Sequence, residues 1–359
     1  MNLELVEKIA NAVLYEGYIL YPYRPSATKN QQRWNFGGVY PRKFSEANKG
    51  TDAWTMQTEC LVSGDENTPV DIRVRFLQMV KREVGEPIAD CGLRIADLED
   101  DEKVSESDFQ IVKFLEVGGK VFQTWQEAIE RELKMPSFSL SELEEQTQQQ
   151  TFTFPSNQES EVLRDENNKI AGVIVRKQEF ISCEVKISAE LVAEKLFKVT
   201  IRIFNQTPFE FGDNRDEGLM RAFVSTHKIL SVRSGEFVSL LEPPTEFSKI
   251  AAECENIGTF PVLVGEEESR DCILSSPIIL YDYPQVSPES AGDFFDGTEM
   301  DEMLTLRIMT LTDDEKNEMR GADERTRRML ERTETMPPEM MMKLHGVMRN
   351  LPPQKENDQ

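Results

Sequence analysis

Apolar and polar residues alternate strictly along the middle of the chain. Every second residue from Ile181 to Ile187 is apolar, and the stretch 197–203 repeats this pattern. Residues 70–76 alternate in the same way, with aspartate and arginine on the polar phase. Because successive side chains of a strand point to opposite faces, the pattern predicts half-buried strands. Several such strands joined by polar turns predict a central antiparallel sheet that resembles a β-sandwich.

Helical spacing is found mainly near the two ends of the chain. Apolar residues recur at helical intervals from Leu3 to Val13, which predicts an amphipathic helix on the core. Residues 121–133 and 217–224 fit shorter helices. Near the C-terminus, the run Thr312–Glu315 has the spacing of a helix-capping box, with acidic residues placed to complement the helix dipole. The chain therefore combines strands and helices in separate regions, and the predicted fold class is α+β.

A polar stretch divides the sequence. Residues 136–168 hold glutamine-, glutamate- and asparagine-rich runs that bury little apolar surface, so we expect a flexible polar linker there. The predicted organisation is an N-terminal α/β unit over 1–135, the linker over 136–168, an antiparallel β domain over 169–290, an acidic helical region over 291–350 and a disordered tail over 351–359.

The net charge excludes some partners. The 359 residues include 41 basic and 65 acidic side chains, for a formal charge of -24. A negative surface repels nucleic acid and anionic membranes, so neither is an expected partner. No stretch approaches the ~18 consecutive apolar residues of a membrane-spanning helix, and no secretory leader is recognisable. We expect a cytoplasmic protein.

Few residues are available for metal or nucleophilic chemistry. His227 and His345 are the only histidines, and none of the five cysteines forms a C-x-x-C pair. We therefore expect no metal site, and Cys60 and Cys183 fall on the apolar phase of predicted strands, which is typical of buried thiols. The glycine pairs fit neither common nucleotide-binding loop, so no cofactor is predicted. No residue is assigned a catalytic role.

The most distinctive feature is an aromatic-basic segment, which we define as Tyr15–Arg42. It holds five of the seven tyrosines, and four basic residues against one acidic residue give it a local charge of +3. Aromatic and arginine side chains together are typical of recognition surfaces for a protein or a small ligand. The alternative is that the tyrosines pack into the fold with their hydroxyls at the surface. The candidate partner- or ligand-binding residues are Tyr18, Tyr21, Tyr23, Arg24, Lys29, Arg33, Trp34 and Tyr40.

A second candidate lies near the C-terminus. Five acidic residues between positions 293 and 302 could bind a hard cation through oxygen ligands, but their spacing is not that of an EF-hand. Acidic residues before a helix are the simpler explanation. Two phenylalanines lie inside the acidic run, and this favours a docking loop. Its residues are Asp293, Phe294, Phe295 and Asp296.

Both ends of the chain resemble one known family. The run Tyr15–Arg24, followed by Arg33-Trp34 and Tyr40-Pro41, resembles the opening of an uncharacterised bacterial family encoded near nickel-iron uptake hydrogenases. The runs Gly292–Arg307 and Thr310–Lys316 are similar to its C-terminal signature. The resemblance implies a cytosolic accessory or assembly protein whose partners would include hydrogenase subunits. It implies no catalytic residue, and the chain lacks the histidine clusters or paired cysteines that a nickel carrier needs.

The sequence therefore predicts a non-enzymatic interaction or accessory protein with a protein partner. One alternative is an enzyme that uses carboxylates alone, or a small-ligand-binding protein with the aromatic-basic segment as its pocket. A second alternative is a structural subunit of a larger assembly.

Overall fold

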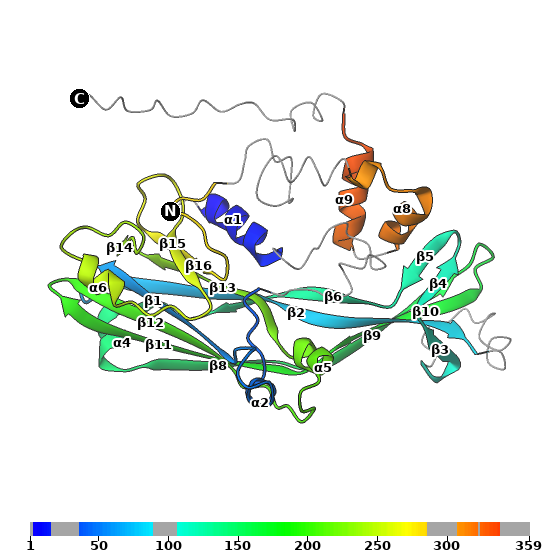
Figure 1. Cartoon of the computed structure of the whole chain (residues 1–359), viewed down its shortest axis with the longest axis horizontal. Coiled ribbons are helices and arrows are strands. Elements are labelled where there is room, and N and C mark those ends of the chain that lie inside the picture. Colours follow the sequence, from blue (N-terminus) through cyan, green and yellow to red (C-terminus); the bar gives the residue numbers. More distant parts are fainter. Residues whose placement is uncertain (1–2, 16–35, 89–105, 286–306, 322–323, 338–359) are drawn as a thin grey trace.

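The chain folds into an α+β protein whose core is built from long antiparallel strands (Figure 1). The computed structural model describes residues 3–15, 36–88, 106–285, 307–321 and 324–337. Two large sheets run along the length of the molecule, and α1, α8 and α9 lie on one side of them (Figure 1). The predicted fold class is confirmed.

The first sheet has five antiparallel strands. Its strand order is β14 (Glu236–Val238), β1 (Thr55–Ser63), β12 (Leu196–Asn205), β11 (Ile181–Ala193) and β8 (Gln148–Phe154). The alternation that predicted strands over 181–188 and 197–203 corresponds to β11 and β12, which pair along nearly their whole length.

The second sheet has nine strands and is organised around β2. Its main order is β15 (Phe260–Leu263), β16 (Cys272–Ser276), β13 (Phe223–Val232), β2 (Pro69–Pro87), β10 (Ile170–Gln178) and β9 (Asn157–Arg164). Three further strands pair with β2: β3 (Phe109–Val112), β6 (Trp125–Lys134) and β7 (Phe138–Ser139). A separate hairpin joins β4 (Phe114–Val117) to β5 (Lys120–Gln123).

The main core lies between the two sheets. The inward-facing residues of β1, β11 and β12 pack against those of β2 and β13 in one cluster, which includes the thiols of Cys60 and Cys183. Burial of aliphatic and aromatic side chains from two facing sheets is what stabilises a β-sandwich. The prediction that both cysteines are buried is confirmed.

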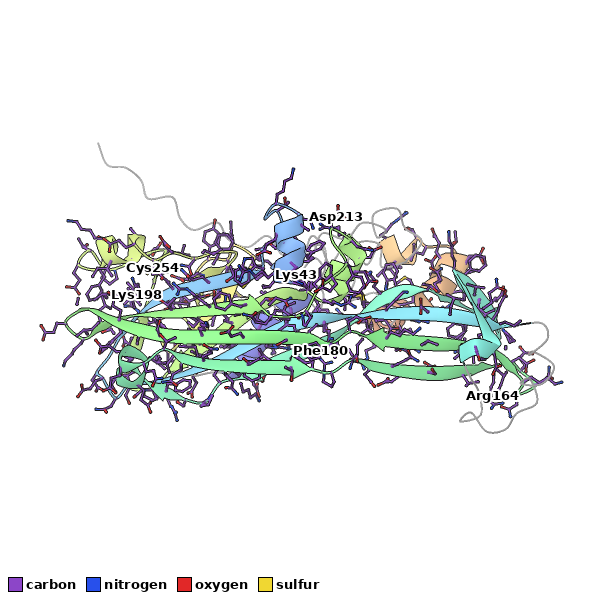
Figure 2. All side chains as sticks on the ribbon, turned by 90° about the horizontal axis from the view of Figure 1, so that it is seen from below. Lys43, Arg164, Phe180, Lys198, Asp213 and Cys254 are labelled. Carbon is purple, nitrogen blue, oxygen red and sulfur yellow. The ribbon has the colours of Figure 1, made fainter. Side chains whose placement is uncertain are left out.

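Short helices cover the sheets and their ends. They are α1 (Leu3–Tyr15), α2 (Arg42–Ala47), the 3₁₀ helix η3 (Glu106–Asp108), α4 (Leu140–Glu145), α5 (Arg215–Met220), α6 (Ser248–Ala252), α8 (Asp313–Arg320) and α9 (Glu324–Glu334). Thr312 and Glu315 form the capping box that the sequence predicts at the start of α8. On the opposite side of the sheets, Lys43 of α2 pairs with Glu210, and Figure 2 places Lys43 near Asp213.

The polar stretch 136–168 is not a flexible linker. It contains β7, α4, β8 and β9, and β8 and β9 are edge strands of the two sheets. An edge strand forms its backbone hydrogen bonds on one side and exposes many of its side chains, so a polar composition is compatible with it. The predicted boundary at 135 does not divide the fold either, because β2, which precedes it, pairs in one sheet with β10 and β13, which follow it.

The helix predicted over 121–133 is also wrong. These residues form β5 and β6, and β6 pairs with β2 from Trp125 to Lys134. Glutamate, alanine and leucine favour helices, but this intrinsic preference is small, and pairing with the long strand β2 overrides it.

Candidate functional site

Most of the predicted binding residues lie outside the described residues. This holds for Tyr18, Tyr21, Tyr23, Arg24, Lys29, Arg33 and Trp34, and for the predicted docking loop Asp293, Phe294, Phe295 and Asp296. The structure does describe the residues on either side of positions 16–35, from Leu3 to Tyr15 and from Phe36 onward, which we call the N-terminal and C-terminal flanks. The geometry of these flanks decides how the segment is held.

The N-terminal flank is the helix α1, which is fixed to the nine-stranded sheet by charged groups. Glu7 accepts hydrogen bonds from Arg73 at 2.5 Å and from Arg75 at 3.3 Å. At the end of the helix, the Tyr15 hydroxyl donates to Glu130 on β6 at 2.5 Å. Arg75 is buried, and hydrogen bonds to charged groups in such surroundings contribute about 1.5–3 kcal/mol each. The last turn of α1, where the segment begins, is therefore held on the sheet.

The C-terminal flank is built into the fold by backbone pairing. Val39 and Phe223 exchange backbone hydrogen bonds of 2.8 and 3.0 Å. Gly37 has φ +56, and a Cβ there would come within 2.6 Å of Pro277, so glycine is required for two reasons. These contacts fix the direction in which the chain enters the described fold.

Tyr40, the one predicted contact residue that the structure describes, is a core residue. Its side chain is 3% exposed and its ring stacks on Phe44 at a centroid distance of 5.1 Å. Burial raises the pKa of its phenol above 10.0. The side chain is buried because Phe44 and Phe209 form an aromatic cluster around it. Tyr40 therefore anchors the segment and does not present a surface to a partner.

One residue of β13 holds both flanks. The Ser225 hydroxyl donates to the carbonyl of Val13 at 2.9 Å, and its backbone N–H donates to the carbonyl of Phe36 at 2.9 Å. Ser225 has φ +54 and lies where the register of β13 with β2 shifts. Such a bulge redirects backbone groups out of the ladder. The same region also brings Leu14 and Tyr40 into one buried cluster.

The surface beside the C-terminal flank combines aromatic and basic groups. Phe36 is 48% exposed. The Arg42 guanidinium lies over the ring of Trp54 at 4.8 Å from its centroid and also pairs with Glu46. A cation over a tryptophan ring is stabilised by the ring quadrupole. The described C-terminal part of the segment therefore combines aromatic and basic groups, as the remainder of the segment does in the sequence.

Lys228 is a buried amine that the sequence analysis missed. Its side chain lies on the core face of β13 and is fully buried, and Nζ has no hydrogen-bond partner among the described residues. Burial lowers its pKa to about 7. The paired residue, Ser275, shares hydrogen bonds with Thr58 at 2.6 Å and Thr259 at 2.7 Å. A neutral lysine is a nucleophile, but these groups are sealed in the core and no substrate reaches them in this conformation.

His227 is buried on the other face of the same strand. Its Nδ1 lies 3.0 Å from the carbonyl of Ser225, and Nε2 has no hydrogen-bond partner among the described residues. Burial, followed by the nearby charges of Arg75, Lys228 and Arg73, lowers its pKa to about 3. The imidazole is therefore neutral at neutral pH and forms part of the buried structure.

The described residues offer neither a metal-binding cluster nor, at the buried cysteines, a reactive thiol. No group of three or more histidine, cysteine or acidic side chains in this part of the chain could hold a metal ion. Burial raises the pKa of the Cys60 and Cys183 thiols, and raises that of Cys272 to about 12, so these thiols are protonated and unreactive at neutral pH.

Comparison with known proteins adds no assignment. No family model matches the chain, and no curated protein matches its sequence. Within the described residues, no helix has both the length and the apolar character needed to cross a membrane.

Proposed function

We propose that this chain is a non-enzymatic interaction protein that binds a protein partner through the aromatic-basic segment. The observation that carries the proposal is the pair of hydrogen bonds from Ser225, which ties Val13, just before the segment, and Phe36, in its C-terminal part, to one point on the sandwich. A long connection whose two ends are fixed on a rigid scaffold is a common way to present binding residues.

Charge supports a protein partner. The segment carries +3 and the whole chain -24, so an acidic patch on a partner is attracted by the segment and repelled elsewhere. Tyrosine, tryptophan and arginine are also the residues that contribute most at protein interfaces. Nucleic acid fits less well, because the remaining surface repels phosphates.

The partner we propose is a subunit of a nickel-iron hydrogenase complex, in keeping with an accessory or assembly role. This part of the proposal rests on the resemblance of residues 15–41 and 292–316 to the hydrogenase-associated family.

A pull-down from a native host tests the proposal. The tagged chain is compared with Arg24→Ala/Trp34→Ala, and bound proteins are identified by mass spectrometry. We expect the double variant to lose most of its partner, because interface tryptophan and arginine contacts contribute about 2 kcal/mol or more each. A hydrogenase subunit among the lost proteins would support the proposed setting.

The matched control is Lys113→Ala/Phe114→Ala, which removes one cation and one aromatic ring from an exposed position on the β4 hairpin. It should retain the partner. Unchanged recovery with a folded Arg24→Ala/Trp34→Ala variant would contradict the proposal. Recovery of a small molecule in place of a protein would indicate that the segment is a ligand pocket.

A further inference from the structure

The strand β8 is an open edge of the five-stranded sheet. Among the described residues it pairs with β11 alone, and Figure 1 shows it at the lower margin of the sandwich. In such a strand, the N–H and C=O groups of every second residue point away from the sheet. Unless another chain pairs with them, they are left to water.

The other edge strands are protected against such pairing, and β8 is not. Protection usually comes from charged side chains, proline or very short length. Among the described residues, β6 and β9 carry charged residues, β15 contains Pro261, and β3, β7 and β14 are short, with four, two and three residues. By contrast, β8 has the sequence QQQTFTF, which includes no charge and no proline over seven residues. Polar and β-branched residues of this kind pair readily with a further strand.

The register of β8 is fixed by the core. Phe152 and Phe154 pack against the main cluster between the sheets, whereas Gln149, Thr151 and Thr153 are exposed on the outer face. Because the side-chain period of a strand is two, this packing prevents a slip by one residue. The free edge therefore presents one defined set of backbone groups and outer-face side chains to an incoming strand.

We propose that β8 pairs with the β8 of a second copy of this chain, in an antiparallel arrangement centred on Thr151. Two chains that each carry -24 repel one another over most of their surface. Because β8 has seven residues and no charge, two copies can pair along it without placing like charges opposite each other. With Thr151 facing its own counterpart, Gln149 of one copy faces Thr153 of the other. Hydroxyl and amide side chains in these positions hydrogen-bond across strands. The five-stranded sheets of two copies then form one continuous sheet.

Sedimentation velocity over a concentration series tests this arrangement with charge variants of Thr151. The unchanged chain is expected to dimerise, and more strongly as salt screens the net charge. Thr151→Lys places two ammonium groups opposite each other across the symmetry axis, so this variant should be monomeric. Thr151→Glu should be monomeric for the same reason. An equimolar mixture of the two variants should recover the dimer, because opposite charges then face each other.

Ser160→Lys is the control, since it adds the same charge to an exposed position on β9, the edge of the other sheet. It should dimerise as the unchanged chain does. An unchanged chain that is monomeric at every concentration and salt level would overturn the proposal. So would a Thr151→Lys variant that dimerises as well as Ser160→Lys. This comparison is decisive even if Thr151→Glu, which also faces Glu184 of its own sheet, does not fold.

Discussion

Val13 and Phe36 lie on either side of residues 16–35, and the carbonyl oxygens of both accept hydrogen bonds from Ser225. Both flanks are thus fixed to the sandwich at the same residue. A connection whose ends are already fixed loses little further entropy through added length. The fold can therefore accommodate a long segment between these two points, and the residues of that segment can be suited to recognition.

We expect Ser225→Gly to loosen the N-terminal flank. Glycine accepts φ +54 without strain and keeps the N–H that bonds Phe36, but the bond to Val13 is lost. The variant should lose about 1 kcal/mol of stability and show faster hydrogen exchange in the last turn of α1. Ser234→Gly makes the same change at another positive φ and should leave that exchange unchanged. Equal exchange in the two variants would show that Ser225 does not hold the flank.

The aromatic cluster behind Tyr40 should be important for stability. Phe44 is fully buried between Tyr40 and Phe209, and Phe44→Ala should cost about 3–5 kcal/mol of unfolding free energy in chemical denaturation. The neighbouring exposed substitution Lys43→Ala removes only a surface ion pair and should cost less than about 1 kcal/mol. Similar losses for both variants would contradict the cluster as an anchor.

Replacing Lys228 with methionine should stabilise the protein and change how its stability depends on pH. The pKa of Lys228 is 10.5 when unperturbed and about 7 in the fold, so above pH 7 the unfolded chain binds the extra proton. The unfolding free energy of the unchanged chain should therefore rise with pH, at a slope approaching 1.4 kcal/mol per unit between about pH 7 and pH 8.

Lys228→Met lacks this group, so that part of the slope should disappear. The variant should also be more stable at neutral pH by roughly 2–4 kcal/mol, because no buried amine is left without a partner. Denaturation curves at several pH values measure both effects. An unchanged slope would show that the amine is solvated in the folded protein.

His227 should make the fold sensitive to mild acid. Its pKa is 6.5 when unperturbed and about 3 in the fold, so the unfolded chain takes up a proton as pH falls below 6.5 while the folded chain does not. The unfolding free energy should fall by about 1.5–2 kcal/mol between about pH 6.5 and pH 5. His227→Gln should remove this loss in denaturation experiments. A variant that is as acid-sensitive as the unchanged chain would assign the effect to other groups.

The sequence predicts those helices and strands that bury one face and expose the other, because their apolar residues then recur with a regular period. α1, β11 and β12 each have one apolar face, so their patterns identify them. In β13, both faces are buried and include His227 and Lys228, so no alternation marks it. The edge strands β8 and β9 have a linker-like composition because their stability comes from backbone pairing, which side chains do not encode.

The composition of the candidate site is visible in the sequence, but its anchoring is not. Ser225 contacts Val13 and Phe36 only because a bulge in β13 turns its backbone to a positive φ. Tyr40 is of a residue type that is common at interfaces, but it is buried in a cluster that includes Phe209, which is distant in the sequence. Such long-range packing leaves no local pattern.

Replacing residues 18–34 with a glycine-serine connection of equal length tests the central claim most directly. If the segment is a recognition element closed on the sandwich by its flanks, the variant should melt within a few degrees of the unchanged chain, about the shift expected for 1 kcal/mol or less. It should also recover none of the partner that the unchanged chain captures. A variant that fails to fold would show that the segment belongs to the core, and one that still captures the partner would place the binding surface elsewhere.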